Sequence, residues 1–316
     1  MSSKAVSSNS MSFRSRVPGR SSIGGVALAA LLGVGCHAQP SARFPTVDSA
    51  IARLRTQAHC SRAVQGEASL SFVGDGRRLN GRVLFLAAAP DRLRLDVYSP
   101  FGVTLSTLTS DGQRFGLYNL EEKSFLMGPP TTCNVERFTQ VPAPPSALVE
   151  LFRGQPPVLK HDAGQTEIRY SQPLFGRGYY QLEVRSNADS TQLLRIGVHP
   201  DDFDLPLEKQ RLRLLRVEVT QGSESLYQVD LSGHAVAKSA VVEQSAEEKA
   251  LGLPPPVPSG PDCDAELPRN MRFFVPTSGH ELAFKTEEVW HNPVLGSAVF
   301  EQEIPAGVTA SESVCR

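Results

Sequence analysis

The spacing of apolar and polar positions changes from helical to alternating near residue 66. Before that point, between residues 47 and 58, apolar residues recur at helical spacing opposite charged positions: Val47, Ile51, Leu54 and Ala58. Thr46 immediately precedes them and suits an N-cap. We predict one amphipathic helix here, whose apolar side covers a sheet.

From residue 66 onward alternate positions are apolar, which is the period of a β-strand. The clearest case is 92–98, where Leu93, Leu95 and Val97 alternate with polar residues. Turn signals such as 110–112 separate strands at intervals of about ten residues, which is typical of an antiparallel meander. After residue 160 the same pattern predicts strands at 167–170, 179–185, 192–198, 212–220, 225–231, 271–275, 282–289 and 297–300.

Proline-rich stretches interrupt the strands twice. The first, 142–145, precedes a second predicted helix at 146–153, with Ser146 as its N-cap. The second lies in 237–262, which we interpret as a surface excursion with one helical turn. No internal repeat is found. We therefore expect a fold that is mainly β with α, in which one large curved sheet carries two or three helices.

The N-terminus has the pattern of an export signal. Four cations and no anion precede residue 36, and an apolar run of twelve residues occupies 23–34. Such a run spans roughly 18 Å as a helix, too short for a hydrocarbon core of about 30 Å. Residues 1–35 are therefore predicted to be a signal peptide. Translation starting at Met11 would give a more compact signal.

Small residues lead directly into Cys36, as in the lipobox of bacterial lipoproteins, which this site resembles. Gly33 stands where that motif usually has leucine, and an ordinary signal cleaved near Ala38 is the alternative. The resemblance implies that Cys36 is lipidated and that 36–45 form a tether. Since His37 is not acidic, it also implies the periplasmic face of the outer membrane.

Four further cysteines follow Cys36: Cys60, Cys133, Cys263 and Cys315. An even number in an exported chain predicts two disulfides, and four cysteines allow three connectivities. We favour Cys60–Cys133 and Cys263–Cys315, one in each half of the chain. A metal site is the weaker interpretation, because no pair has C-x-x-C spacing.

Charge composition and the absence of catalytic motifs disfavour nucleic-acid-binding proteins and enzymes. The 32 cations balance 33 anions, which disfavours nucleic acid as a partner. The seven histidines belong to no catalytic signature, and neither a nucleophile elbow nor a phosphate loop is present. We therefore expect a protein that is not an enzyme and needs no cofactor.

The order of several segments resembles the LolA/LolB-like lipoprotein-localisation superfamily between residues 46 and 293. The segments are 66–72, 82–85, 90–105, 151–156, 267–269 and 287–292. The resemblance implies a strongly curved, half-open antiparallel β-barrel over 46–300, with the helices as a lid, followed by a tail, 301–316. It also implies a monomer that binds outer-membrane lipid and the acyl chains of lipoproteins, received from a LolA-type carrier. A structural or envelope-sensing lipoprotein without transport activity is the alternative.

The same resemblance suggests which residues touch lipid. Strand positions facing the expected cavity are Leu93, Leu95, Val97, Val103, Leu105, Phe115, Leu117, Leu182 and Val184, although each could simply fill a core. Phe101 occupies the turn after 92–98, where family receptors carry a protruding apolar residue. It is expected to enter the membrane; packing back on the sheet is the alternative.

Overall fold

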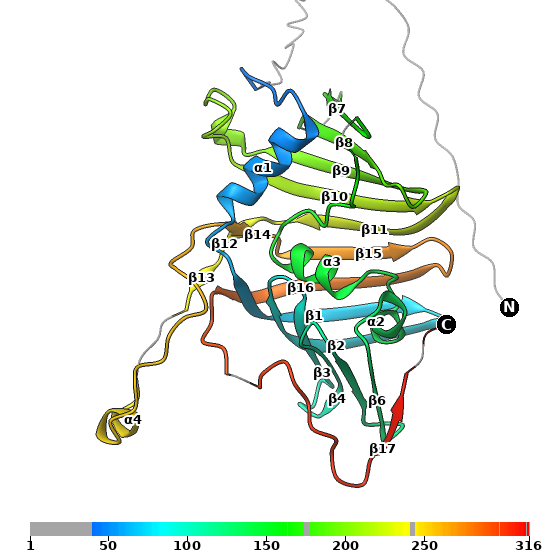
Figure 1. The fold of residues 1–316 in the computed structure, drawn as a ribbon, viewed down its shortest axis with the longest axis vertical. Coiled ribbons are helices and arrows are strands. Elements are labelled where there is room, and N and C mark those ends of the chain that lie inside the picture. The colour runs from blue at the N-terminus through cyan, green and yellow to red at the C-terminus, as the bar shows by residue number, and fades with distance from the viewer. Residues whose placement is uncertain are drawn as a thin grey trace, which may run out of the picture. The chain divides into compact units, whose positions relative to one another are not determined.

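The computed structural model describes residues 40–162, 164–173, 177–240, 244–296, 298–313 and 315. The predicted signal peptide and Cys36 lie outside these residues. Within them the chain forms one large, curved, mainly antiparallel sheet with helices on one face (Figure 1).

Two meanders build this sheet. The first runs in chain order through β1 (Ala63–Gly74), β2 (Arg77–Ala88), β3 (Arg92–Tyr98), β4 (Thr104–Ser110), β5 (Phe115–Asn119) and β6 (Ser124–Gly128). The second comprises β7 (Thr166–Ser171), β8 (Tyr179–Arg185), β9 (Ser190–Val198), β10 (Leu212–Gln221), β11 (Glu224–Ser232), β15 (Asn270–Val275) and β16 (His280–His291). Pairing of β1 with β16, from Val64↔His291 to Val73↔Glu281, joins the meanders into one sheet.

Four short strands complete the described β-structure. β13 (Lys238–Ser239) pairs with β16, and β17 (Thr309–Glu312) pairs with β6, both in parallel. β12 (Ala235–Val236) pairs separately with β14 (Glu266–Leu267). The sheet stays open, because its end strands β7 and β17 pair only inward.

Three helices lie on the same face of the sheet (Figure 1). α1 (Val47–Gln57) contacts β7 and β10, α2 (Thr132–Thr139) contacts β5, and α3 (Pro145–Phe152) contacts β2 and β3. The fourth described α-helix, α4 (Ala246–Ala250), belongs to the excursion, and a 3₁₀ turn covers Pro200–Asp202. As predicted, Thr46 caps α1, in a capping box with Ser49. α3 begins one residue earlier than predicted, with Pro144 rather than Ser146 at the N-cap.

Aromatic rings fix α3 onto the centre of the sheet. Phe152 stacks on Phe85 of β2 with ring centroids 4.7 Å apart, and meets Phe284 of β16 edge-on at 5.6 Å. Gly66 of β1 makes room for the Phe85 ring, since a Cβ there would lie 2.5 Å from it. The main core of the protein therefore lies between the helices and one apolar face of the sheet.

The opposite face is covered in part by the chain after β16. Phe300 is buried against Ala63, Leu86 and Ala88. Residues 298–300 form a turn, so the strand predicted at 297–300 is wrong for its described part. Packing of Phe300, Val299 and Leu295 holds this segment, together with a hydrogen bond from Arg94 to the Val299 carbonyl oxygen, so it needs no strand pairing.

The disulfide pairing predicted from the sequence is also wrong. Two disulfides are present, as expected, but they are Cys60–Cys263 and Cys133–Cys315. The prediction paired cysteines within each half of the chain, but the β1–β16 and β6–β17 ladders bring the two halves together. These ladders bring the beginning of the domain next to its last third, and α2 next to the C-terminal segment.

Candidate functional site

A cavity of about 430 Å³ opens between α1 and α3, on the helix-covered face. Its wall consists of the end of α1 with Ala58 and His59, the first turns of α3, and the segment 153–159. Tyr227, on the core-facing side of β11, contributes from the sheet. The cavity thus lies where two covering helices leave the apolar face incompletely closed.

Arg153 connects these two helices across the cavity wall. Its Nε and Nη2 both donate to the carbonyl oxygen of Ser61, at 2.8 Å for Nε, in the connection between α1 and β1. Its Nη1 donates to Glu150 of α3 at 2.9 Å. Burial raises the pKa of Glu150 above its usual range, against the opposing effect of Arg153 and Arg55. Arg153 and Glu150 thus form an ion pair in the cavity wall, which offsets part of the cost of burying the carboxylate.

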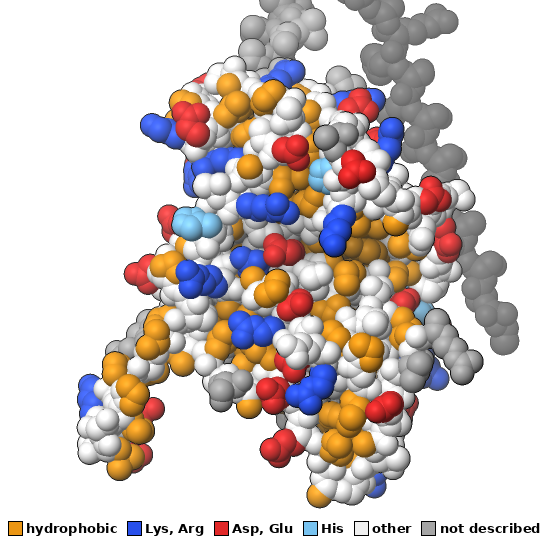
Figure 2. Space-filling view, viewed as in Figure 1, with side chains coloured by type: hydrophobic (Ala, Val, Ile, Leu, Met, Phe, Trp, Pro, Cys, Tyr) orange, Lys and Arg blue, Asp and Glu red, His pale blue; other side chains and the backbone are white. Residues whose placement is uncertain are grey.

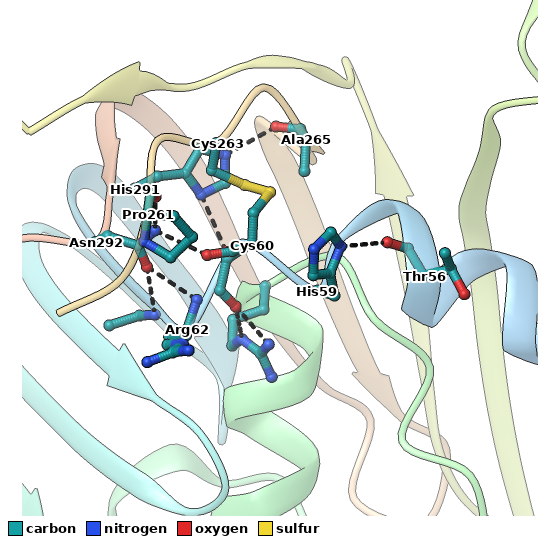
Figure 3. Close-up of a disulfide and its surroundings, with 12 residues drawn as sticks. Thr56, His59, Cys60, Arg62, Pro261, Cys263, Ala265, His291 and Asn292 are labelled. Atoms are coloured by element: carbon teal, nitrogen blue, oxygen red, sulfur yellow. Dashed lines mark hydrogen bonds between the residues drawn. A yellow bond between two sulfur atoms is a disulfide. The ribbon is translucent and has the colours of Figure 1, made fainter.

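The connection held by Arg153 is itself fixed by the segment that ends β16 (Figure 3). Nδ2 of Asn292 donates to the carbonyl oxygens of Cys60 and Pro261, and Oδ1 accepts from the backbone N–H groups of Arg62 and Ala63. His291 Nε2 donates to the Ala265 carbonyl oxygen at 2.8 Å. With the Cys60–Cys263 disulfide beside them, these bonds make one rim of the cavity rigid.

Two neutral polar groups of the cavity wall have no protein partner. The side chains are those of Tyr227 and Gln155, each only 4% exposed. Among the described residues nothing hydrogen bonds to the Tyr227 hydroxyl or to Gln155 Oε1. Burial raises the pKa of Tyr227 far above its usual value, so the hydroxyl keeps its proton at any physiological pH.

The predicted cavity-lining residues are placed in two groups. Six are buried in the core beneath the helices: Leu93, Leu95, Phe115, Leu117, Leu182 and Val184. Val97 is half-buried against that core, whereas Val103 and Leu105 are 50% and 42% exposed. None of the nine lines the 430 Å³ cavity. Tyr227, Gln155 and Arg153 do line it. Arg153 and Gln155 belong to the motif 151–156, whereas no sequence signal points to Tyr227.

Phe101 is 93% exposed at the tip of the β3–β4 turn. Ser99 Oγ accepts from the backbone N–H groups of Phe101 and Val103, at 3.3 and 3.2 Å. Gly102 adopts a positive φ of 79°, which favours glycine. We call the exposed apolar residues of this turn and strand, Phe101, Val103 and Leu105, the Phe101 patch.

A second hollow, of about 730 Å³, lies across β11, β15, β16, β1 and β2 beside Pro100. Most of its charged residues already have partners. Arg82 pairs with Glu67, Arg272 with Glu281, and Asp230 with Arg216. It is therefore a sheet surface whose charged side chains are mostly paired with one another.

Hydrophobic side chains also gather at the surface of the helix-covered face, beside the helices (Figure 2). Partly buried residues that contact the core include Leu70, Phe72, Phe138 and Leu226. Across the described part of the chain, no three metal-ligating side chains cluster and no helix is both long and apolar enough to cross a bilayer.

Comparison with known proteins finds similarity in structure only. No family model matches the chain, and no curated protein matches it. A DUF1329 family protein from Desulfovibrio piger superposes with a TM-score of 0.50 at 13% identity, covering 80% of this chain and 95% of that one. This likeness shows a common fold.

Two further solved structures are similar with lower scores. One is a LolA superfamily protein from Nitrosomonas europaea, with 11% identity, coverage of 82% and 99%, and a TM-score of 0.46. The other is a putative outer membrane lipoprotein-sorting protein domain from Vibrio parahaemolyticus, with 12% identity, coverage of 81% and 96%, and a TM-score of 0.48.

Proposed function

We propose that this protein is a lipoprotein of the outer membrane, facing the periplasm, that binds acyl chains and acts in lipoprotein reception or insertion. The observation that carries the proposal is the cavity between α1 and α3. It opens at the boundary of two helices that lie on the apolar face of one large sheet.

Acyl chains suit this site for a physical reason. Half of the residues that line the cavity are apolar, among them Ala147, Val158 and Leu159, and each methylene removed from water against them contributes about 0.8 kcal/mol. A longer chain enters if α1 and α3 move apart and it takes their place on Leu93, Leu95, Leu182 and Val184. In that state the sheet has the form of a half-open barrel with the helices as a lid.

The Phe101 patch supports a second part of the proposal, contact with the membrane surface. A turn with its apolar tip held in solvent is costly for a protein that stays in water, and it suits insertion into lipid. Together with an acylated Cys36, the patch gives two independent attachments to the bilayer.

Native mass spectrometry of the membrane-extracted protein tests acyl binding. We expect a co-purifying lipid that is lost on delipidation and regained when fatty acyl compounds are added. Delipidated protein that takes up no acyl compound of any chain length would refute the proposal.

The excursion favours one alternative, a structural or envelope-sensing lipoprotein of the same fold. Leu251 and Val257 are each 75% exposed there, beside α4, and an exposed apolar arm suits a protein partner. Transfer of acylated cargo from a LolA-type carrier distinguishes the two. A receptor accepts it, whereas a sensing or structural protein does not.

A further inference from the structure

Two buried polar side chains in the wall of the cavity between α1 and α3 each have an atom without a protein partner. Tyr227 offers a buried O–H donor, and Gln155 offers a buried oxygen acceptor, and neither has a partner among the described residues. An unpaired buried polar group costs free energy, so a ligand that supplies both partners is favoured.

The charges nearby argue against an ionic head group in this place. Arg153 is bound to Glu150 and to the Ser61 carbonyl oxygen, and Arg55 is exposed at the rim. Besides this ion pair, the buried polar side chains of the wall are the neutral Tyr227 and Gln155, with apolar neighbours in the wall that include Pro156 and Val158.

We infer that this cavity binds the secondary amide of an N-acylated amphiphile, with the amide carbonyl accepting from Tyr227 and the amide N–H donating to Gln155. The inference rests on the proposed function and adds the chemistry of the head group to it. An ester presents a carbonyl of the same shape but has no N–H, so it leaves Gln155 Oε1 buried without a partner. An amide is therefore preferred over the matching ester.

Two isosteric probes test this preference: N-methyldodecanamide and methyl dodecanoate. Their dissociation constants are measured on the delipidated mature protein by displacement of 1-anilinonaphthalene-8-sulfonate. We expect the amide to bind about tenfold more tightly than the ester, the effect of one ordinary hydrogen bond. This comparison needs no variant and so does not depend on how any substitution folds.

Variants then assign the two contacts. Tyr227→Phe should weaken both probes by about tenfold and keep their ratio, because both carbonyls lose the same donor. Gln155→Met should lower amide affinity to that of the ester. Tyr180→Phe is the matched control, since that hydroxyl accepts from the Phe44 N–H outside the cavity, and both affinities should stay unchanged. Melting temperatures check that each variant folds.

Equal affinities of the two probes for the wild-type protein would overturn the inference and leave acyl binding intact. An unchanged amide preference in Gln155→Met would overturn it as well. If neither probe binds, the proposed function itself fails. Because acylated peptides and free amide lipids share this group, an N-dodecanoyl tripeptide is compared with an N-dodecanoyl sphingoid base. Tighter binding of either supports the inference and identifies its source.

Discussion

Asn292 hydrogen bonds through both polar atoms of its side chain. The two Oδ1 contacts are 2.9 and 3.2 Å long, and the two Nδ2 contacts are 2.8 and 2.6 Å long. The residue lies in the left-handed region with φ of 50°, which asparagine tolerates better than most residues. In the motif 287–292 this side chain therefore has a structural role, because it fixes the segment between α1 and β1 against the end of β16.

His234 makes stability depend on pH. Burial, aided by the nearby Arg213, lowers the pKa of His234 to about 4 in the folded protein, below the ordinary value of about 6.5. Between about pH 6.5 and 4, His234 is therefore protonated in the unfolded chain but stays neutral in the folded protein. Stability should fall as pH drops from about 6.5 toward 4, by roughly 3 kcal/mol from this residue.

Urea unfolding of wild type and His234→Gln across that pH range measures the effect. The variant should lose less stability than wild type, because glutamine has no proton to bind. His291, whose pKa is also lowered by burial, contributes with the same sign in both proteins and cancels in the comparison. Parallel pH profiles for the two proteins would show that His234 does not titrate as argued.

Phe101→Glu should separate folding from membrane contact. The side chain packs on nothing that folding requires, so the free energy of unfolding should change by less than about 0.5 kcal/mol. Loss of an inserted phenylalanine is worth about 1.5–3 kcal/mol, so binding to lipid vesicles should weaken by a factor of about ten or more. Co-flotation with vesicles measures it.

Leu251→Glu is the matched control for this experiment, since Leu251 is also an exposed apolar residue but lies in the excursion. It should leave vesicle binding unchanged. A Phe101→Glu protein that floats with vesicles as wild type does would remove the turn from the membrane proposal.

At the scale of elements, periodicity predicts the helices and strands whose apolar and polar residues alternate regularly. The alternation over 92–98 gives β3 with its bounds, and the helical spacing after Thr46 gives α1. β17 and α2 were missed. All four residues of β17 are exposed and polar or small, so the segment has no alternating pattern that would predict a strand. Pairing with β6 and the nearby Cys133–Cys315 disulfide hold it in place. α2 has only eight residues between proline-rich stretches.

Some residues of the candidate site follow from sequence periodicity, and others depend on contacts between distant segments. Alternation places Leu93 and Leu95 on the helix-covered face, which is what a period of two can decide. Leu105 differs, because a register shift between Val97 and Tyr98 pairs Tyr98 with Thr104 and leaves Leu105 exposed. Tyr227 and Gln155 could not be identified as cavity residues from the sequence, because the cavity depends on how the end of α1 packs beside the first turns of α3.

The C-terminal segment should depend on its disulfide. In Cys133→Ala/Cys315→Ala, β17 keeps the β6 ladder and the buried Ser313–Asn134 hydrogen bond, but loses its covalent link. We expect stability to fall by about 3–5 kcal/mol and amide exchange to rise first in 309–313. Hydrogen exchange with mass spectrometry measures it, with Cys60→Ala/Cys263→Ala as the comparison.

Peptide mapping of the unreduced wild-type protein provides the companion result. It should find Cys60 linked to Cys263 and Cys133 linked to Cys315, with no free thiol in the denatured mature protein. If residues 309–313 of Cys133→Ala/Cys315→Ala exchange as slowly as in wild type, the ladder with β6 holds β17 without the disulfide.

At the scale of the whole molecule, the proposal combines two membrane attachments with one binding cavity. Without its predicted signal peptide the chain has 28 cations and 33 anions, a formal net charge of −5, so long-range electrostatics does not attract it to an anionic surface. Stable association with a bilayer requires two signals, and a single acyl chain is marginal. A diacylglyceryl group on Cys36 supplies more than one chain, and the Phe101 patch adds a local contact that need not hold the protein by itself.

Cys36→Ala therefore separates anchoring from function. Without the thiol no diacylglyceryl group can attach, and the variant should accumulate as a soluble protein or as an inner-membrane precursor with its signal uncleaved. Fractionation of envelope membranes on a density gradient, with immunodetection, measures the change. The folded domain should keep the acyl and amide preferences of wild type in solution, because no residue of the cavity wall lies before Arg55. If the variant still fractionates with the outer membrane at wild-type levels, Cys36 is not the anchor, and the alternative cleavage near Ala38 accounts better for the N-terminus.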